Sequence, residues 1–132
     1  ARPSASITTR TSSVLSPSCT ASESTILSET DQLFLAELKT VMQVSSGVRR
    51  FGAAALDLAF VAAGRYDGFW ERGLSLWDIA AGYLLVKEAG GFVSDFASRD
   101  LSLTSGDIVA ANSAMHVPLL KHLREAKAGL NG

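Results

Sequence analysis

The spacing of apolar side chains divides this chain into a polar segment, residues 1–31, and a more apolar remainder, residues 32–132. About half of the first 31 residues are serine or threonine. No helical or strand period continues across them, and only a short strand at residues 13–15 is expected there. Such a composition buries little apolar surface. We therefore interpret residues 1–31 as a poorly ordered or divergent segment.

From Thr30 onwards, helical and strand patterns alternate along the chain. Apolar residues at helical spacing predict a helix that begins at Thr30 or Asp31 and ends at Gly47. Further helices are expected over residues 53–63, 76–89 and 114–128, and extended segments over residues 48–51, 66–71, 92–96 and 108–111. This alternation predicts an α/β layered sandwich.

The predicted helices differ in how their apolar positions are distributed. Residues 53–63 and 76–89 are apolar on nearly every face, which is typical of helices buried inside a larger structure. The last helix is amphipathic instead. Its inward residues are expected to be Leu119, Leu120 and Leu123, and its outward residues Lys121, Arg124, Glu125 and Lys127.

Composition narrows the class of protein. The 132 residues are 47% apolar and 19% charged, with a formal net charge of -1, which suits one modest globular domain. The charge gives no support for a nucleic-acid or membrane partner. The single cysteine, Cys19, excludes a disulfide framework and favours a cytoplasmic location. Because the chain lacks an initiator Met, we expect it to be part of a longer protein.

Two carboxylates have both a structural and a chemical interpretation. Asp78 lies in the first turn of a predicted helix, where the helix dipole favours a negative charge. A carboxylate at a rigid helix start also suits a hard cation such as Mg²⁺. Glu71, at the end of a predicted strand, is either a solvated strand end or a polar contact to a ligand held beside Asp78. Trp77 can be explained by core packing.

Small residues open the first apolar helix. Gly52, Ala53 and Ala54 would allow a ligand to approach the free backbone N–H groups of a helix start. Close packing of the helix on a sheet explains the same residues equally well.

Several blocks together resemble the second half of the inositol monophosphatase family. The segment that carries most weight is WDIAAG, residues 77–82, which is similar to the C-terminal signature of that family. The other blocks are GAAALD (52–57), VAAG (61–64), DGFWE (67–71), EAGG (88–91) and IVAAN (108–112). The resemblance covers about residues 32–126. We expect residues 1–31 to lie outside it, as a divergent or misread segment.

The resemblance implies a Mg²⁺-dependent phosphatase of phosphorylated polyols or sugars, with the family's layered α/β fold and often a homodimer. It implies that Asp78 is a metal ligand that also touches a substrate hydroxyl. It further implies that Glu71 binds the polyol ring, and that Gly52, Ala53 and Ala54 line the substrate. No catalytic residue is identified in this half, and the exact phosphate monoester is left open.

The family's other metal ligands, a glutamate and an Asp-Pro-x-Asp-Gly-Thr block, have no counterpart in this chain. One carboxylate does not complete the near-octahedral coordination of Mg²⁺. We therefore expect no appreciable activity from this chain alone. Two alternatives stay open: a non-catalytic interaction protein, associated with transcription machinery and RNA as some bacterial relatives are, and an inactive remnant that exposes its apolar helices.

Overall fold

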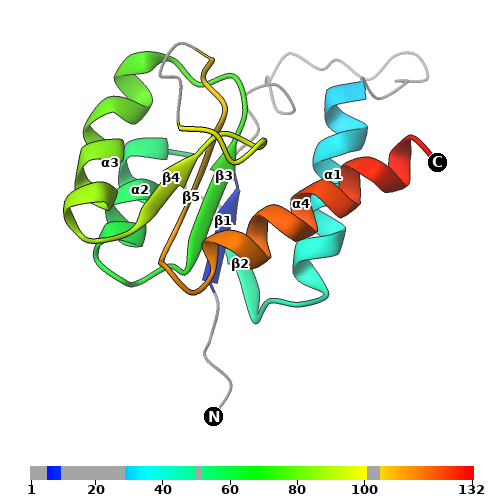
Figure 1. The fold of residues 1–132 in the computed structure, drawn as a ribbon, viewed down its shortest axis with the longest axis horizontal. Helices are drawn as coiled ribbons and strands as arrows, with labels where there is room; N and C mark the ends of the chain where they lie inside the picture. Colours follow the sequence, from blue (N-terminus) through cyan, green and yellow to red (C-terminus); the bar gives the residue numbers. More distant parts are fainter. Residues whose placement is uncertain (1–5, 10–28, 50–51, 101–104) are drawn as a thin grey trace.

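A computed structural model describes residues 6–9, 29–49, 52–100 and 105–132 of the chain. These residues form a five-stranded sheet with a pair of helices on each face (Figure 1). The strand order is β2-β1-β3-β5-β4, so β3 is the central strand. The predicted α/β layered sandwich is confirmed.

The sheet is mixed. β1 (Ser6–Thr9) pairs in parallel with β2 (Gly47–Arg49) on one side and with β3 (Gly68–Glu71) on the other. β5 (Ile108–Ala111) pairs antiparallel with β3 and with β4 (Phe92–Ser94), which lies at the edge. Because β3 is buried throughout, it presents side chains to a core on each face of the sheet.

Each face of the sheet has its own core. On one face, α2 (Ala54–Ala62) and α3 (Leu76–Glu88) pack around Phe69 of β3. On the other face, Trp70 belongs to a core that includes the buried side of α4 (His116–Leu130) and Val41 of α1 (Glu29–Met42). Burial of one such large side chain contributes about 1.5–3 kcal/mol.

The first strand corrects the interpretation of residues 1–31. Residues 6–9 form β1, which lies between β2 and β3, although no sustained strand period marks it in the sequence. This short strand is held by its parallel pairing with two neighbours. Because those neighbours are distant along the chain, the pairing leaves no pattern in the sequence of residues 6–9. The strand expected at residues 13–15 lies outside the described residues.

The start and end of the first helix also differ from expectation. α1 begins at Glu29, so Asp31 lies within its first turn, where acidic side chains favour the helix dipole. The helix ends at Met42, and Gly47 opens β2 instead of ending the helix. The remaining helices and strands are confirmed to within a few residues.

Two strands are shorter than expected. Tyr66 was predicted to begin β3, but its ring packs edge-on against Phe60 with centroids 5.2 Å apart, and pairing starts at Gly68. β4 ends at Ser94 because the chain turns there, with the Asp95 N–H donating to the Arg99 carbonyl oxygen at 3.1 Å. β3 therefore begins, and β4 ends, where a local contact replaces the hydrogen bonds between strands.

The two apolar helices are not buried on every face. α2 exposes Leu56, and α3 exposes Leu84 and Leu85. Trp77 is 81% exposed, which overturns its interpretation as core packing, whereas Trp70 is the buried tryptophan. Burial on all sides requires a second layer of structure over α2 and α3, and the described residues do not supply one. None of the helices in the described part of the chain is long and apolar enough to cross a membrane.

Candidate functional site

The start of α2 has no side-chain cap. Gly52 is exposed and has φ of +75°, a left-handed conformation that glycine adopts without strain. Ala53 is extended and makes no side-chain cap, and Ala54 begins the helix and is 2% exposed. The first-turn N–H groups of this helix are therefore not capped by the side chain that precedes it.

Asp78 occupies the third position of α3 and closes the start of that helix. Its Oδ2 accepts a hydrogen bond from the Ser75 N–H at 3.2 Å, and the Asp78 N–H donates to the Ser75 carbonyl oxygen at 3.0 Å. This is the capping geometry expected for a helix-start carboxylate. The structural interpretation of Asp78 is thus confirmed, and its half-buried carboxylate still borders the surface.

Glu71 is the last residue of β3, and its partner across the ladder is Ile108. Only 1% of its surface is exposed, so it is not the solvated strand end that one interpretation expected. Strand alternation places it on the same face as Phe69, toward α2 and α3. Its carboxylate is therefore buried on the face of the sheet that α2 and α3 cover. The segments that carry the other candidate residues lie on the same face.

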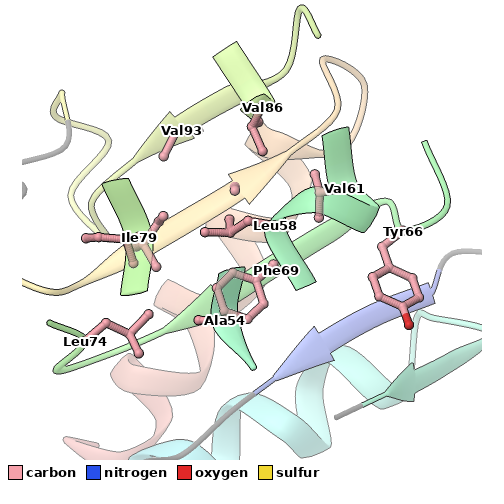
Figure 2. Close-up of a cluster of buried hydrophobic side chains, with 11 residues drawn as sticks. Ala54, Leu58, Val61, Tyr66, Phe69, Leu74, Ile79, Val86 and Val93 are labelled. Carbon is pink, nitrogen blue, oxygen red and sulfur yellow. The ribbon is translucent and has the colours of Figure 1, made fainter. Parts of the chain in front are cut away.

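Helix packing brings these three segments to one end of the sheet. Figure 2 shows Ala54, Leu74 and Ile79 at one end of the core and Val61 and Val86 at the other, so α2 and α3 run in the same direction. Both helices therefore begin near the end of β3.

α2 and α3 also pack closely against each other. A Cβ added at Gly82 of α3 would lie 2.5 Å from the Leu58 Cβ of α2. The absence of a side chain at Gly82 lets the two helices approach closely. The candidate residues Gly52, Ala53, Ala54, Glu71 and Asp78 thus lie at a common end of the molecule.

A buried ion pair anchors the residue after Glu71. Arg72 donates from Nη1 to Glu37 Oε2 at 2.7 Å, and its Nη2 lies 2.6 Å from Glu37 Oε1. The guanidinium carbon also lies 3.6 Å from the ring centroid of Phe96. Burial raises the pKa of Glu37, and the opposing effect of Arg72 does not cancel the rise. This pair was not predicted, because its partners are 35 positions apart and no local spacing joins them.

The carboxylates of the described residues do not gather around one point as the ligands of a magnesium ion do. Those residues contain no group of three or more His, Cys, Asp or Glu side chains that could hold a metal ion. One Asp78 oxygen is engaged at the helix start. By themselves, the described residues therefore do not fit a complete Mg²⁺ site.

Sequence comparison assigns these blocks to a known family. The profile of the inositol monophosphatase family matches residues 3–128. The chain belongs to the inositol monophosphatase family. The match begins far before residue 32, so the family resemblance extends into the segment that we expected to lie outside it. β1 is part of that extension.

Relatives within the family have two kinds of name. The inositol-1-monophosphatase of Mesorhizobium japonicum is 60% identical over 92 residues, which cover 70% of this chain and 35% of that protein. The Nus factor SuhB of Pseudomonas aeruginosa is 55% identical over 87 residues, covering 66% and 32% of the two chains. The chain thus spans about a third of the length of the curated relatives that it matches.

A solved structure agrees with these matches. The extragenic suppressor protein SuhB from Bartonella henselae superimposes with a TM-score of 0.73 at 41% identity, covering 91% of this chain and 42% of that one. The fold is therefore that of the inositol monophosphatase family. The expectation that nucleic acid is not a partner rested on net charge alone, and a relative named a Nus factor gives it no support.

Proposed function

We propose that this chain supplies the hydroxyl-binding end of a Mg²⁺-dependent phosphatase that acts on a small phosphorylated polyol or sugar. The observation that carries the proposal is the convergence of two helix starts and the end of β3. Phosphatase chemistry is common to the family that the chain belongs to, and the substrate and the metal are part of the proposal.

The chemistry of this end suits a polyol. The uncapped first-turn N–H groups of α2 donate to hydroxyl or phosphate oxygens, and the dipoles of both helices favour negative charge there. The carboxylate of Asp78 accepts hydrogen bonds from hydroxyl groups. Because Gly52 and Ala53 are small and exposed, a ring could approach the backbone closely there, with the buried Ala54 beneath it.

Glu71 has a more demanding role in this proposal. Its carboxylate is buried, so a substrate hydroxyl reaches it only when the side chain turns outward or the covering residues separate. In that position the carboxylate would accept a hydrogen bond from one hydroxyl of the polyol, which would favour ligands that carry a hydroxyl there.

Asp78 would contribute one oxygen ligand to Mg²⁺. The ion prefers near-octahedral oxygen coordination and retains several waters, so further carboxylates beyond those described are needed to hold it. A bound Mg²⁺ would polarise the phosphate and favour attack by water. Asp78 itself would orient a substrate hydroxyl and hold its position through the Ser75 N–H.

Ligand titration of the full chain tests the proposal. Inositol 1-phosphate should shift the backbone amide resonances of residues 52–55 and 76–78, in the presence of Mg²⁺. Asp78→Asn and Glu71→Gln should each weaken binding about tenfold, since each removes a charge-assisted hydrogen bond. Glu88→Gln, at the far end of α3, is the matched control and should bind as the unaltered chain does. Unchanged binding in both site variants would refute the proposal.

A separate activity assay tests the incomplete metal site. The chain alone should release no appreciable phosphate from inositol 1-phosphate. Mg²⁺-dependent release that lithium inhibits would contradict this expectation and would show that the carboxylates of this chain suffice.

A second candidate function is a non-catalytic interaction role. It is favoured by the relative that is named Nus factor SuhB. Capture of RNA polymerase or RNA by the immobilised chain, with Asp78→Asn retaining full capture, would support this role and separate it from the phosphatase proposal.

A further inference from the structure

A hollow of about 660 Å³ opens between the later turns of α4, the turn that follows β4 and the end of β3. Its lining includes four basic side chains and two acidic ones: Arg72, Arg99, Arg124, Lys127, Asp95 and Asp107. It lies on the other face of β3 from Glu71, because Arg72 follows Glu71 and points toward α1. The hollow is therefore distinct from the end that carries Glu71 and Asp78.

Two of the four cations are already neutralised. Arg72 is paired with Glu37. Arg99 Nε lies 2.8 Å from Asp95 Oδ2, although the Arg99 side chain is 79% exposed. These two pairs leave the charges of Arg124 and Lys127 against the Asp107 carboxylate, which accepts a hydrogen bond from the Gly73 N–H at 3.1 Å. Lys127 also lies near enough to Glu37 for its charge to act against the rise in the pKa of that carboxyl.

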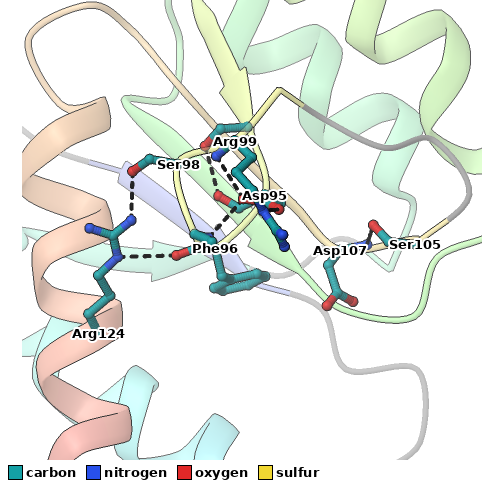
Figure 3. A network of polar contacts seen from close by, with 9 residues as sticks. Asp95, Phe96, Ser98, Arg99, Ser105, Asp107 and Arg124 are labelled. Carbon is teal, nitrogen blue, oxygen red and sulfur yellow. Dashed lines mark hydrogen bonds and ion pairs between the residues drawn. The ribbon is translucent and has the colours of Figure 1, made fainter.

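Arg124 is held in place without being neutralised. Its Nε donates to the Phe96 carbonyl oxygen at 3.2 Å and its Nη2 donates to Ser98 Oγ at 2.6 Å (Figure 3). Both acceptors are uncharged. Within the described part of the chain, neither Arg124 nor Lys127 forms an ion pair.

The turn that fixes Arg124 is itself rigidly built. Asp95 Oδ1 accepts from the Ala97 N–H at 2.8 Å and from the Arg99 N–H at 2.9 Å. Burial acts to raise the pKa of Asp95, but these N–H groups and the Arg99 guanidinium outweigh it and lower the pKa. Ser98 has φ of 63° and is the one non-glycine residue with positive φ among those described. The wall of the hollow is therefore formed before any ligand arrives.

The position of Lys127 has a simpler explanation than that of Arg124. A cation in the last turn of a helix favours the helix dipole. That effect does not require a guanidinium fixed by two neutral acceptors over a concave surface. A guanidinium that is fixed by uncharged acceptors keeps its charge and its remaining Nη hydrogens, and both are suited to bind a phosphoryl group.

We propose that this hollow binds the phosphoryl group of a small phosphorylated ligand. Arg124 provides the Nη hydrogens that Phe96 and Ser98 leave available, and Lys127 adds a second positive charge. The concave shape favours a small ligand, whereas a nucleic acid would be matched by a basic stripe along an element or across a face. The site is independent of the proposed hydroxyl-binding end.

Titration of the full chain with inorganic phosphate tests this site. Phosphate should shift the Arg124 Nε–H and the Ser98 and Arg99 amide resonances, with an apparent Kd of about 1 mM. Arg124→Gln should weaken binding about tenfold, and Lys127→Gln by a smaller factor. Lys127→Gln leaves every hydrogen bond of the turn intact, so it remains informative if Arg124→Gln disturbs the turn.

The matched control is Lys121→Gln. It removes the same charge from the same helix, but Lys121 faces Glu125 at 3.9 Å and does not line the hollow. Equal weakening by Lys121→Gln and Lys127→Gln would overturn the proposal in favour of general charge screening. The absence of phosphate-dependent shifts would also overturn the proposal. So would a chain that binds a short single-stranded RNA but not phosphate, if Lys127→Gln abolishes the RNA binding.

Discussion

The two helical layers that cover the sheet differ in how they are stabilised. The α2–α3 layer carries few charges, packs closely through Gly82 and Leu58, and exposes Leu84, Leu85 and Trp77. The α1–α4 layer carries a buried ion pair and a charged outer surface on α4. One layer therefore depends on shape and apolar area, and the other combines an apolar core with specific electrostatic contacts.

This difference separates the two proposed binding regions. In the apolar layer the candidate residues lie where the helices begin, because the first backbone N–H groups of a helix have no partner within it. In the charged layer, side chains themselves form the candidate site between α4 and the turn after β4. The following changes break or sharpen this comparison.

The largest expected effect is on the ion pair of the charged layer. Arg72→Met should lower the free energy of unfolding by about 3 kcal/mol at neutral pH, because it leaves the fully buried Glu37 carboxylate uncompensated. The double variant Glu37→Leu/Arg72→Met should recover most of this loss, since no charge is then buried. Urea unfolding of the single and double variants measures both, and a double variant as unstable as Arg72→Met would contradict the argument.

A smaller loss is expected in the apolar layer. Gly82→Ala should cost about 1–3 kcal/mol, because the added Cβ has no space beside Leu58. Gly129→Ala in α4 is the matched control: nothing lies within 4 Å of its added Cβ, and alanine should stabilise the helix by up to about 1 kcal/mol. Thermal unfolding of both variants tests the contrast, which fails if the two substitutions change stability in the same direction.

The pH dependence of stability isolates Glu37 from the rest of the charged layer. The pKa of Glu37 is raised above its ordinary value of 4.5, mainly by burial. Its protonated form is thus favoured by folding, and this contribution is present below the unfolded pKa and lost as pH rises through the folded pKa. The chain should therefore lose stability relative to Glu37→Gln as pH rises above about 4.5.

Urea unfolding of the unaltered chain and of Glu37→Gln over a range of pH measures whether the difference in stability falls as pH rises. Asp95 and His116, whose pKa values are lowered, titrate in both proteins and cancel in the difference. Parallel curves would mean that Glu37 keeps an ordinary pKa in the folded state.

The smallest effect on stability is expected at the exposed apolar positions. Leu84→Lys should change the free energy of unfolding by no more than about 0.5 kcal/mol. It should nevertheless reduce self-association, because it interrupts the apolar surface of α3. Leu35→Lys changes a similarly exposed leucine of α1, and sedimentation should show less effect there. If both substitutions reduce self-association equally, the α2–α3 layer has no special role in self-association.

Much of the local structure could be predicted from sequence. Helical spacing located four helices, and the buried residues Leu119, Leu120 and Leu123 of α4 are those expected. The block WDIAAG at residues 77–82 indicated the family, and the family is confirmed. These features depend on residues close together in the chain, whose periodicity and spacing are visible in the sequence.

Only the tertiary structure decided which distant residues meet. Residues 6–9 join the sheet between β2 and β3, Glu37 pairs with Arg72, and Arg124 reaches Ser98. α2 and α3 run in the same direction, which brings Ala54 and Asp78 to the same end, and they pack closely where Gly82 meets Leu58. The sequence by itself determined the elements and the family, while burial, pairing and the hollow beside α4 required the packed chain, because they arise from contacts between residues that no local pattern links.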